Sequence, residues 1–213
     1  MQPSAITIET TSSGSMPPTL SSLFYNKHKD LHRELVNCRF VLDLKENPNK
    51  EKYTGFLQRV KADLLIFEPA LEKLQNINLK PFFRLASLQE DIKILDIENT
   101  QEDHPHSKEH QQHLTYLADY KPHALLAHAG VRYYGFLHGG QQRRERLEKE
   151  WGIPLKLYAF EKDPKQMVQD LTDVLNEYAK TLTDQQFKEI ENELATALVF
   201  AGDTLLIDLR HLT

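Results

Sequence analysis

Apolar residues recur at intervals of three and four along most of the chain, which places them on one face of an α-helix. The first such stripe contains Leu31, Leu35, Cys38, Val41 and Leu42. Two more stripes near the C-terminal end consist of Leu171, Val174, Leu175 and Tyr178, and of Phe187, Ile190, Leu194, Ala197, Leu198, Ala201, Leu205 and Leu209. Few glycines interrupt the body of the chain, and the pattern predicts an all-α fold.

Proline, asparagine and threonine mark the expected ends of these helices. Asn47-Pro48-Asn49 separates the first stripe from a helix expected to run from about Glu51 to Leu74. Lys80-Pro81 is expected to open a third helix, and Thr183-Asp184 to cap the start of the last one. Between them, the polar stretch from Glu98 to Lys108 is expected to form a loop.

The segment that begins at Pro122 contains an unusual group of glycines. An otherwise apolar helix is interrupted by Gly130, Gly135, Gly139 and Gly140, four glycines within eleven residues. Each glycine destabilises a helix by about 0.5 to 1 kcal/mol relative to alanine, so the group destabilises it by about 2 to 4 kcal/mol. Two explanations are compatible: a kink in the helix, or a flat ligand lying close to the main chain.

Length and composition indicate one domain. The chain has 213 residues and a mass of 24.8 kDa, with 40% hydrophobic and 27% charged residues. These values are typical of a single compact fold. Residues 1–19 are rich in Ser, Thr and Pro and are expected to form a flexible leader, so we expect the helical domain to occupy residues 20–213.

Charge and cysteine content exclude several classes of function. The formal net charge of −5 disfavours binding to nucleic acid or to an anionic membrane. Cys38 is the single cysteine, which excludes an intrachain disulfide framework and any cysteine-based zinc or iron–sulfur site. The chain has no run of eighteen apolar residues and no signal-like N-terminus, so we expect a soluble, cytoplasmic protein.

The glycine-rich segment resembles a known signature. Ala127 to Gln141, AHAGVRYYGFLHGGQ, is similar to the segment AHAYTRYLGDLSGGQ of animal-type and bacterial heme oxygenases. Lys29-Asp30-Leu31-His32 resembles the proximal-histidine helix of that family, and Arg84, Leu88 and Asp91 match an R-x-x-x-L-x-x-D stretch. Tyr158-Ala159-Phe160 resembles a further aromatic segment of the family. The resemblance covers most of the chain and implies the all-α, single-domain heme oxygenase fold with a glycine-kinked distal helix.

The resemblance also implies a cofactor site. In the family, heme lies between a proximal helix whose histidine ligates the iron and a distal helix kinked at glycines. By position, His32 is the expected ligand of the heme iron, and Lys29 and Arg132 are expected to contact the cofactor. The remaining residues expected at the heme are Gly135, Phe136, Gly139 and Gly140.

The implied activity is oxidative cleavage of heme to biliverdin, carbon monoxide and iron, with O2 and electrons from an external donor such as a redox partner protein. Phe136 stands where the family signature has an aspartate, and a phenyl ring neither donates nor accepts a hydrogen bond. Arg132 and the main chain at Gly135 and Gly139 are therefore the expected organisers of distal water. The alternative is a catalytically impaired homologue that acts as a heme carrier, a sensor or a non-heme interaction module.

Several charged residues have a second interpretation. His28 and His32 form an i, i+4 pair that could bind a metal ion, and His138 beside the glycines could approach the iron. A cluster that could chelate a divalent cation, or be solvated, consists of Asp103, His104, His106, Glu109, His110 and His113. Arg143, Arg144 and Arg146 fit either a charged helix face or a contact with an acidic reductase.

Overall fold

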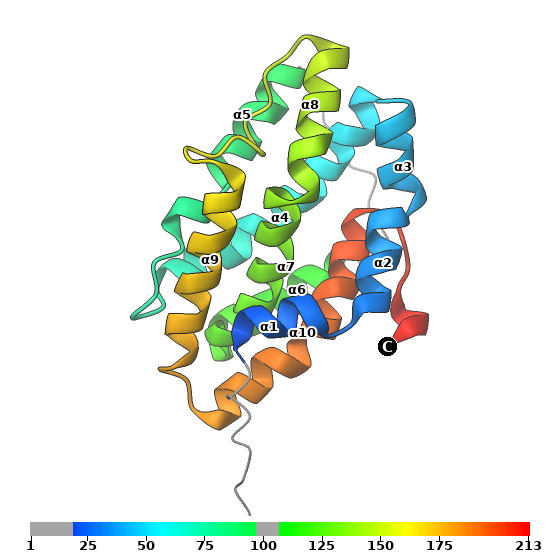
Figure 1. Ribbon diagram of the computed structural model, residues 1–213. Coiled ribbons are helices and arrows are strands. Elements are labelled where there is room, and N and C mark those ends of the chain that lie inside the picture. Colours follow the sequence, from blue (N-terminus) through cyan, green and yellow to red (C-terminus); the bar gives the residue numbers. More distant parts are fainter. Residues whose placement is uncertain (1–18, 97–106) are drawn as a thin grey trace, which may run out of the picture.

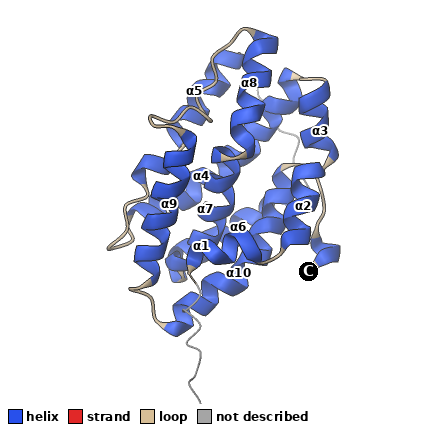
Figure 2. Ribbon diagram, viewed as in Figure 1, coloured by secondary structure: helices blue, strands red, loops and turns tan. Residues whose placement is uncertain are grey.

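The computed structural model describes residues 19–96 and 107–213, and this part of the chain is helical without strands (Figures 1 and 2). The all-α prediction is confirmed. The expected leader, apart from Thr19, and residues 98–106 of the expected loop lie outside the described residues. The loop prediction is wrong at its end, because Ser107 and Lys108 already belong to a helix.

The elements follow one another as a series of helices joined by short connections. The first half contains α1 (Leu20–Asn26), α2 (Lys29–Asn37), α3 (Arg39–Glu46), α4 (Lys50–Glu72), the 3-10 turn η1 (Lys80–Phe82) and α5 (Leu85–Leu95). The second half contains α6 (Ser107–Tyr120), the 3-10 turn η2 (Pro122–Ala124), α7 (Leu125–Leu137), α8 (Gly139–Trp151), α9 (Pro164–Ala179), α10 (Asp184–Thr204) and the 3-10 turn η3 (Arg210–Leu212).

Two helix starts are fixed by the capping residues that the sequence indicated. The side chain of Asn49 accepts a hydrogen bond from the main-chain N–H of Lys52 at the start of α4. Thr183 and Gln186 form a reciprocal capping box at the start of α10, each side chain bonding the main-chain N–H of the other. Because these side chains bond main-chain groups that the helix leaves unpaired, local sequence is enough to locate both boundaries.

Two boundary predictions are wrong, and both have a tertiary cause. Lys80-Pro81 opens only the single turn η1, and α5 begins at Leu85, where the carboxylate of Glu68 from α4 accepts the N–H groups of Arg84 and Leu85 at 2.7 and 3.2 Å. The last apolar stripe extends to Leu209, but the helix that carries it ends at Thr204. The chain turns there, because the N–H of Ile207 donates to the carbonyl of Gly202.

The core is organised around α7, whose residues are nearly all buried. α10 packs along α7, while α4 packs against α5, α6 and α7. In the view of Figure 1, α2 and α3 lie on one side, α9 on the other, and α7 and α8 between them.

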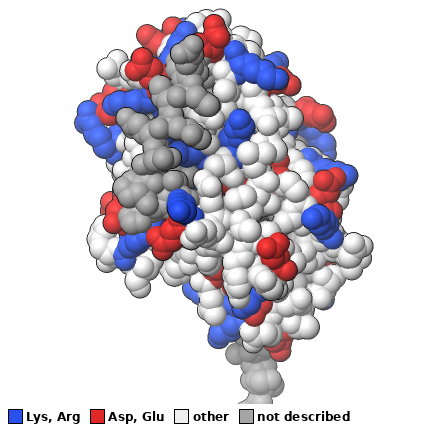
Figure 3. All heavy atoms as spheres, turned by 180° about the vertical axis from the view of Figure 1, so that it is seen from behind, with Lys and Arg blue, Asp and Glu red and all other residues white. Residues whose placement is uncertain are grey.

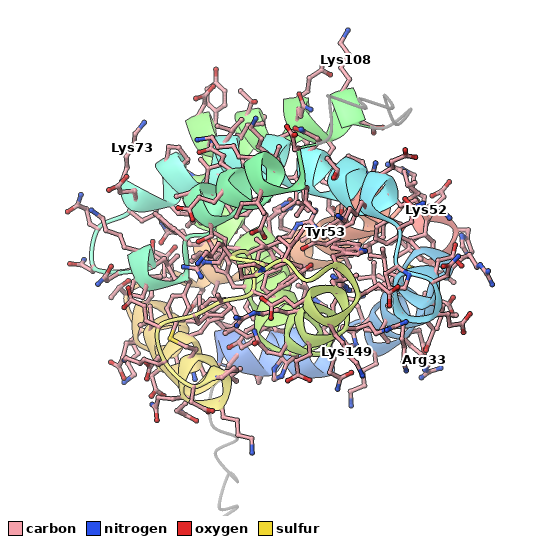
Figure 4. The ribbon with its side chains drawn as sticks, turned by 90° about the horizontal axis from the view of Figure 1, so that it is seen from above. Arg33, Lys52, Tyr53, Lys73, Lys108 and Lys149 are labelled. Carbon is pink, nitrogen blue, oxygen red and sulfur yellow. The ribbon has the colours of Figure 1, made fainter. Side chains whose placement is uncertain are left out.

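Figure 4 shows the ring of Tyr53 inside the molecule, whereas Lys52 and Lys73 point outward. Acidic and basic side chains are intermixed on the face drawn in Figure 3.

The connection between α8 and α9 is held by two residues of the R-x-x-x-L-x-x-D stretch. The buried carboxylate of Asp91 accepts the N–H groups of Lys156 and Leu157 at 2.5 and 2.9 Å. The guanidinium of Arg84 donates to the carbonyl of Ala159 at 2.8 Å and lies over the ring of Phe160. These contacts fix a non-helical segment whose own main chain has few local hydrogen bonds.

We predict that Asp91→Ala lowers the free energy of unfolding by about 3 kcal/mol, because a buried and a part-buried N–H group lose a charged acceptor. Chemical denaturation measures this change. Glu90→Ala is the matched control, since it removes an exposed carboxylate from the same helix and is expected to change stability by no more than about 0.5 kcal/mol. Equal effects of the two substitutions would contradict the assignment.

Candidate functional site

The glycine-rich segment is kinked where the sequence predicted. α7 ends at Leu137, α8 begins at Gly139, and His138 between them has a ψ of −78°, which departs from the usual α-helical value of about −42°. The side chain of Gln141 donates to the carbonyls of Phe136 and Tyr158 at 3.3 and 2.8 Å, which ties the end of α7 to the connection that follows α8. The predicted kink in the distal helix is confirmed.

The four glycines of the segment serve two different purposes. A Cβ atom on Gly130 would lie 2.2 Å from the ring of Phe24, and one on Gly140 would lie 2.4 Å from the ring of Tyr158. Nothing lies within 4 Å of a Cβ atom built on Gly135 or Gly139. Gly130 and Gly140 thus make room for aromatic rings of the protein itself, and only Gly135 and Gly139 border open space.

His32 lies near this open main chain but on a different helix. Its side chain is exposed on α2. Partial burial lowers the pKa of His138 at the kink, and the charge of His32 lowers it further. Lys29 is also exposed and lies one turn before His32, on the same face of α2. α2 and the kinked helix α7 both pack against α10.

Phe136 belongs to the interior rather than to the open surface of the kink. Its ring is buried and meets the ring of Tyr158 edge to face, with the centroids 5.9 Å apart. The ring of Tyr158 is completely buried, and its hydroxyl accepts a hydrogen bond from Arg143. Phe136 and Tyr158 therefore form an apolar wall behind the helix break.

Arg132 lies one turn before Gly135 and is held in a buried ion pair. Its guanidinium donates to Asp63 of α4 at 2.6 Å and to the hydroxyl of Thr204 of α10 at 2.8 Å. Burial raises the pKa of Asp63 to about 6, although the charge of Arg132 acts in the opposite direction. These contacts fix the guanidinium between α4, α7 and α10. Without them, the long arginine side chain would be mobile.

Histidines from α6 and α7 form a second polar cluster around α10. Glu193 of α10 accepts hydrogen bonds on one oxygen, Oε1, from Nε2 of His113 at 2.8 Å and from Nε2 of His128 at 2.9 Å. Nearby, Nδ1 of His110 lies 3.5 Å from Asp63, and its ring packs on Phe200. We call His113, His128 and Glu193 the histidine–glutamate cluster.

The interpretation of the histidines in the polar stretch as solvated is wrong for two of them. His110 is only 3% exposed, and His113 is half-buried on the inner face of α6. Asp103, His104 and His106 lie outside the described residues. Among the described residues, the structure brings no third metal-binding side chain to His28 and His32. Arg144 and Arg146 pair with Glu148 and Glu150 along α8, as expected for a charged helix face.

The electrostatics of the cluster follow from burial and mutual hydrogen bonding. Burial lowers the pKa of His110 to about 2 and also lowers the pKa of His128. Burial alone would raise the pKa of Glu193, but the hydrogen bonds from His113 and His128 outweigh it and hold that pKa at about 2. The hydrogen bond to Glu193 raises the pKa of His113. Glu193 is therefore a carboxylate at neutral pH.

Asp63 and Glu193 are the residues that the sequence pattern did not single out. Each lies on the apolar face of its helix: Asp63 is three residues after Val60, and Glu193 is three residues after Ile190. A carboxylate at such a position must find a partner in the interior. A carboxylate at a position where the helical pattern places apolar residues is the sequence signal that identifies both residues.

Sequence comparison decides the family. The profile described as Heme oxygenase matches residues 19–201 of the chain. The chain belongs to the heme oxygenase family. It is 28% identical to heme oxygenase 1 of Pongo abelii over 154 residues, which cover 66% of this chain and 52% of that relative. The chain thus spans about half the length of the curated relatives that it matches.

Solved heme oxygenases have the same fold. The enzyme from Leptospira interrogans has a TM-score of 0.74 at 20% identity, covering 88% of this chain and 98% of that one. Heme oxygenase-2 from Synechocystis sp. PCC 6803, in complex with heme and NO, has a TM-score of 0.75 at 21% identity, covering 87% of this chain and 83% of that one. In the described part of this heme oxygenase homologue, no helix combines the length and apolar character of a membrane span.

We predict opposite effects of alanine at two adjacent glycines. Gly140→Ala should lower the free energy of unfolding by about 1 to 3 kcal/mol, since the new methyl group collides with Tyr158. Gly139→Ala meets no neighbour and should leave stability unchanged or raise it by up to about 1 kcal/mol. Chemical denaturation of the heme-free variants distinguishes them, and a larger loss at Gly139 would refute this account of the kink.

The histidine–glutamate cluster predicts a pH-dependent stability. The lowered pKa of Glu193 gives stability that is complete above its ordinary pKa of 4.5 and is lost as pH falls towards 2. The raised pKa of His113 gives stability that is complete below its ordinary pKa of 6.5 and is lost as pH rises through the raised value.

We therefore predict that His113→Ala lowers stability most, by about 1 kcal/mol, between about pH 4.5 and 6.5. The measurement is chemical denaturation of both proteins in metal-free buffer across this range and on either side of it. Lys108→Ala, on the exposed face of α6, serves as the control. A difference between wild type and His113→Ala that does not change with pH would contradict the prediction.

Proposed function

We propose that the chain binds heme between α2 and the kink of α7 and α8, and degrades it oxidatively to biliverdin, carbon monoxide and iron. The observation that carries this proposal is the relation of His32 to the kink. His32 presents an exposed imidazole on α2, its charge contributes to the lowered pKa of His138, and the main chain of Gly135 and Gly139 on either side of His138 borders open space. Family membership and the fold shared with heme complexes support the same function.

The residues present fit a heme group. Neutral imidazole is a good axial ligand of heme iron, and the exposed side chain of His32 can supply it. On the other side, Gly135 and Gly139 present main chain without any side chain, which a flat macrocycle can approach closely. Lys29, exposed one turn before His32, can neutralise a heme carboxylate.

Each residue of the proposed site then has a defined task. His32 ligates the iron, Lys29 pairs with a carboxylate, and Gly135 and Gly139 give the macrocycle access to the main chain. Gly140 acts indirectly, since its packing on Tyr158 keeps the kink in place. Phe136 closes the site from behind as an apolar wall. When bound, heme supplies both the redox-active iron and the porphyrin carbon that is oxidised.

Phe136 carries no polar atom, so main-chain N–H groups and Arg132 are left to organise water on the distal side of the heme. N–H groups at the start of a helix lack partners within that helix, so the first residues of α8 can donate to water at the kink. We assign Arg132 as a positioning residue, held one turn away by Asp63 and Thr204. O2 and electrons from an external donor, such as a redox partner protein, complete the proposed reaction.

Replacement of the proposed iron ligand tests heme binding. We predict that His32→Ala weakens hemin affinity at least about 10-fold and alters the Soret band, and that added imidazole restores the band by occupying the vacated position. Titration of the purified protein with hemin measures both effects. His123→Ala is the matched control, because its imidazole bonds Glu189 rather than facing the kink. A wild-type spectrum in His32→Ala would refute the ligand assignment.

Turnover is tested separately from binding. Heme-loaded protein supplied with ascorbate and oxygen should lose its Soret band, gain the absorption of a bilin and release carbon monoxide. Unaltered heme under these conditions would contradict the proposed degradation and leave a heme carrier or sensor. Failure to bind hemin at all would contradict both and leave a non-heme interaction module.

A further inference from the structure

The histidine–glutamate cluster has the composition of a transition-metal site. Nε2 of His113, Nε2 of His128 and a carboxylate oxygen of Glu193 all lie within 4.8 Å of one another. The three residues come from α6, α7 and α10, so the cluster joins helices that are distant in sequence. His128 precedes Gly139 by eleven residues, which corresponds to about 16 Å along a helix. The cluster is therefore separate from the proposed heme site.

The donor atoms specify the class of cation. Two imidazole nitrogens and one carboxylate oxygen suit Zn²⁺ and related first-row ions, whereas Ca²⁺ and Mg²⁺ take mainly oxygen ligands. The spacing is also close to what a tetrahedral ion needs. Bonds of about 2.0 Å place adjacent ligands about 3.3 Å apart, and the two nitrogens now lie 2.8 and 2.9 Å from Oε1 of Glu193. These two N···O distances would have to lengthen by about 0.4 to 0.5 Å to reach that ligand spacing.

The burial and accessibility of the three side chains suit such a site. The side chains of His128 and Glu193 are only 4% and 13% exposed, so their positions are fixed by packing. The side chain of His113 is 32% exposed, which gives an ion a route from solvent. Both histidines direct Nε2 at the same oxygen, so one carboxylate group holds the two imidazoles next to each other.

The protonation states are also suitable. Glu193 is ionised at neutral pH because its pKa is about 2, and burial keeps His128 neutral by lowering its pKa. Binding would replace two Nε2–H···O hydrogen bonds by bonds to the ion. The proton of neutral His128 would move from Nε2 to Nδ1, and the Nε2 proton of His113 would move to Nδ1 or leave to solvent. The raised pKa of His113 means that protons compete with the ion for this ligand.

We propose that His113, His128 and Glu193 bind one divalent transition-metal ion of the Zn²⁺ class, with a fourth position open to solvent. The bound ion links α6, α7 and α10 beside the buried pair of Arg132 and Asp63. The site is independent of heme, and it takes a different class of ligand from the one proposed at the kink.

The test uses the whole 213-residue chain, free of heme, after treatment with a chelator. Titration with Co²⁺ should produce the visible absorption of a tetrahedral complex, and Zn²⁺ should displace it. Zn²⁺ should also raise the melting temperature, because it binds the folded state alone. His113→Asn should weaken Co²⁺ and Zn²⁺ affinity at least about 10-fold and abolish the stabilisation by Zn²⁺.

His123→Asn provides the matched control, because His123 also bonds a glutamate of α10 but lies outside the cluster. It should bind Co²⁺ and Zn²⁺ as the wild type does. Circular dichroism establishes that both variants fold, and the exposure of His113 favours this outcome. Unchanged Co²⁺ affinity in His113→Asn, or no tetrahedral spectrum in the wild type, would overturn the proposal, whatever the result of hemin titration.

Discussion

The close approach of the Tyr158 ring to the main chain of Gly140 is the contact on which the site depends. The ring occupies the position that any larger residue at 140 would need for its Cβ atom. Asp91 and Arg84 hold the segment that carries Tyr158, and Gln141 ties that segment to the last turn of α7. The helix break at His138 is therefore supported from behind by packing and hydrogen bonds, and Gly139 is left with open space in front.

α7 also connects this kink to a buried polar interior. Along its length, Arg132 reaches Asp63 and Thr204, and His128 reaches Glu193. Buried charges are expensive unless they are paired and hydrogen-bonded, and each of these groups has such a partner. The ion pair fixes the position of α7 relative to α4 and α10, so the same helix combines a rigid polar anchor with an open, glycine-lined end.

Local signals were sufficient for part of this architecture. Asn49 and Thr183 cap helices through their own main-chain neighbours, and the glycines around Gly139 mark the kink directly. The sequence could not separate the glycines that border open space from Gly130 and Gly140, because their purpose depends on Phe24 and Tyr158, which fold against them from distant segments.

The start of α5 and the histidine–glutamate cluster escaped prediction for the same reason. Glu68 of α4 caps the start of α5. Glu193 of α10 accepts hydrogen bonds from His113 of α6 and His128 of α7.

The central claim is that heme lies against the open main chain of the kink, and its most direct test is the NMR spectrum of glycine-labelled protein. Ferric heme should broaden the amide signals of Gly135 and Gly139 strongly, relative to the diamagnetic zinc porphyrin. Gly152, at the far end of α8 and about 20 Å from Gly139, should keep its signal. Unbroadened signals from Gly135 and Gly139 in the ferric heme complex would contradict the account.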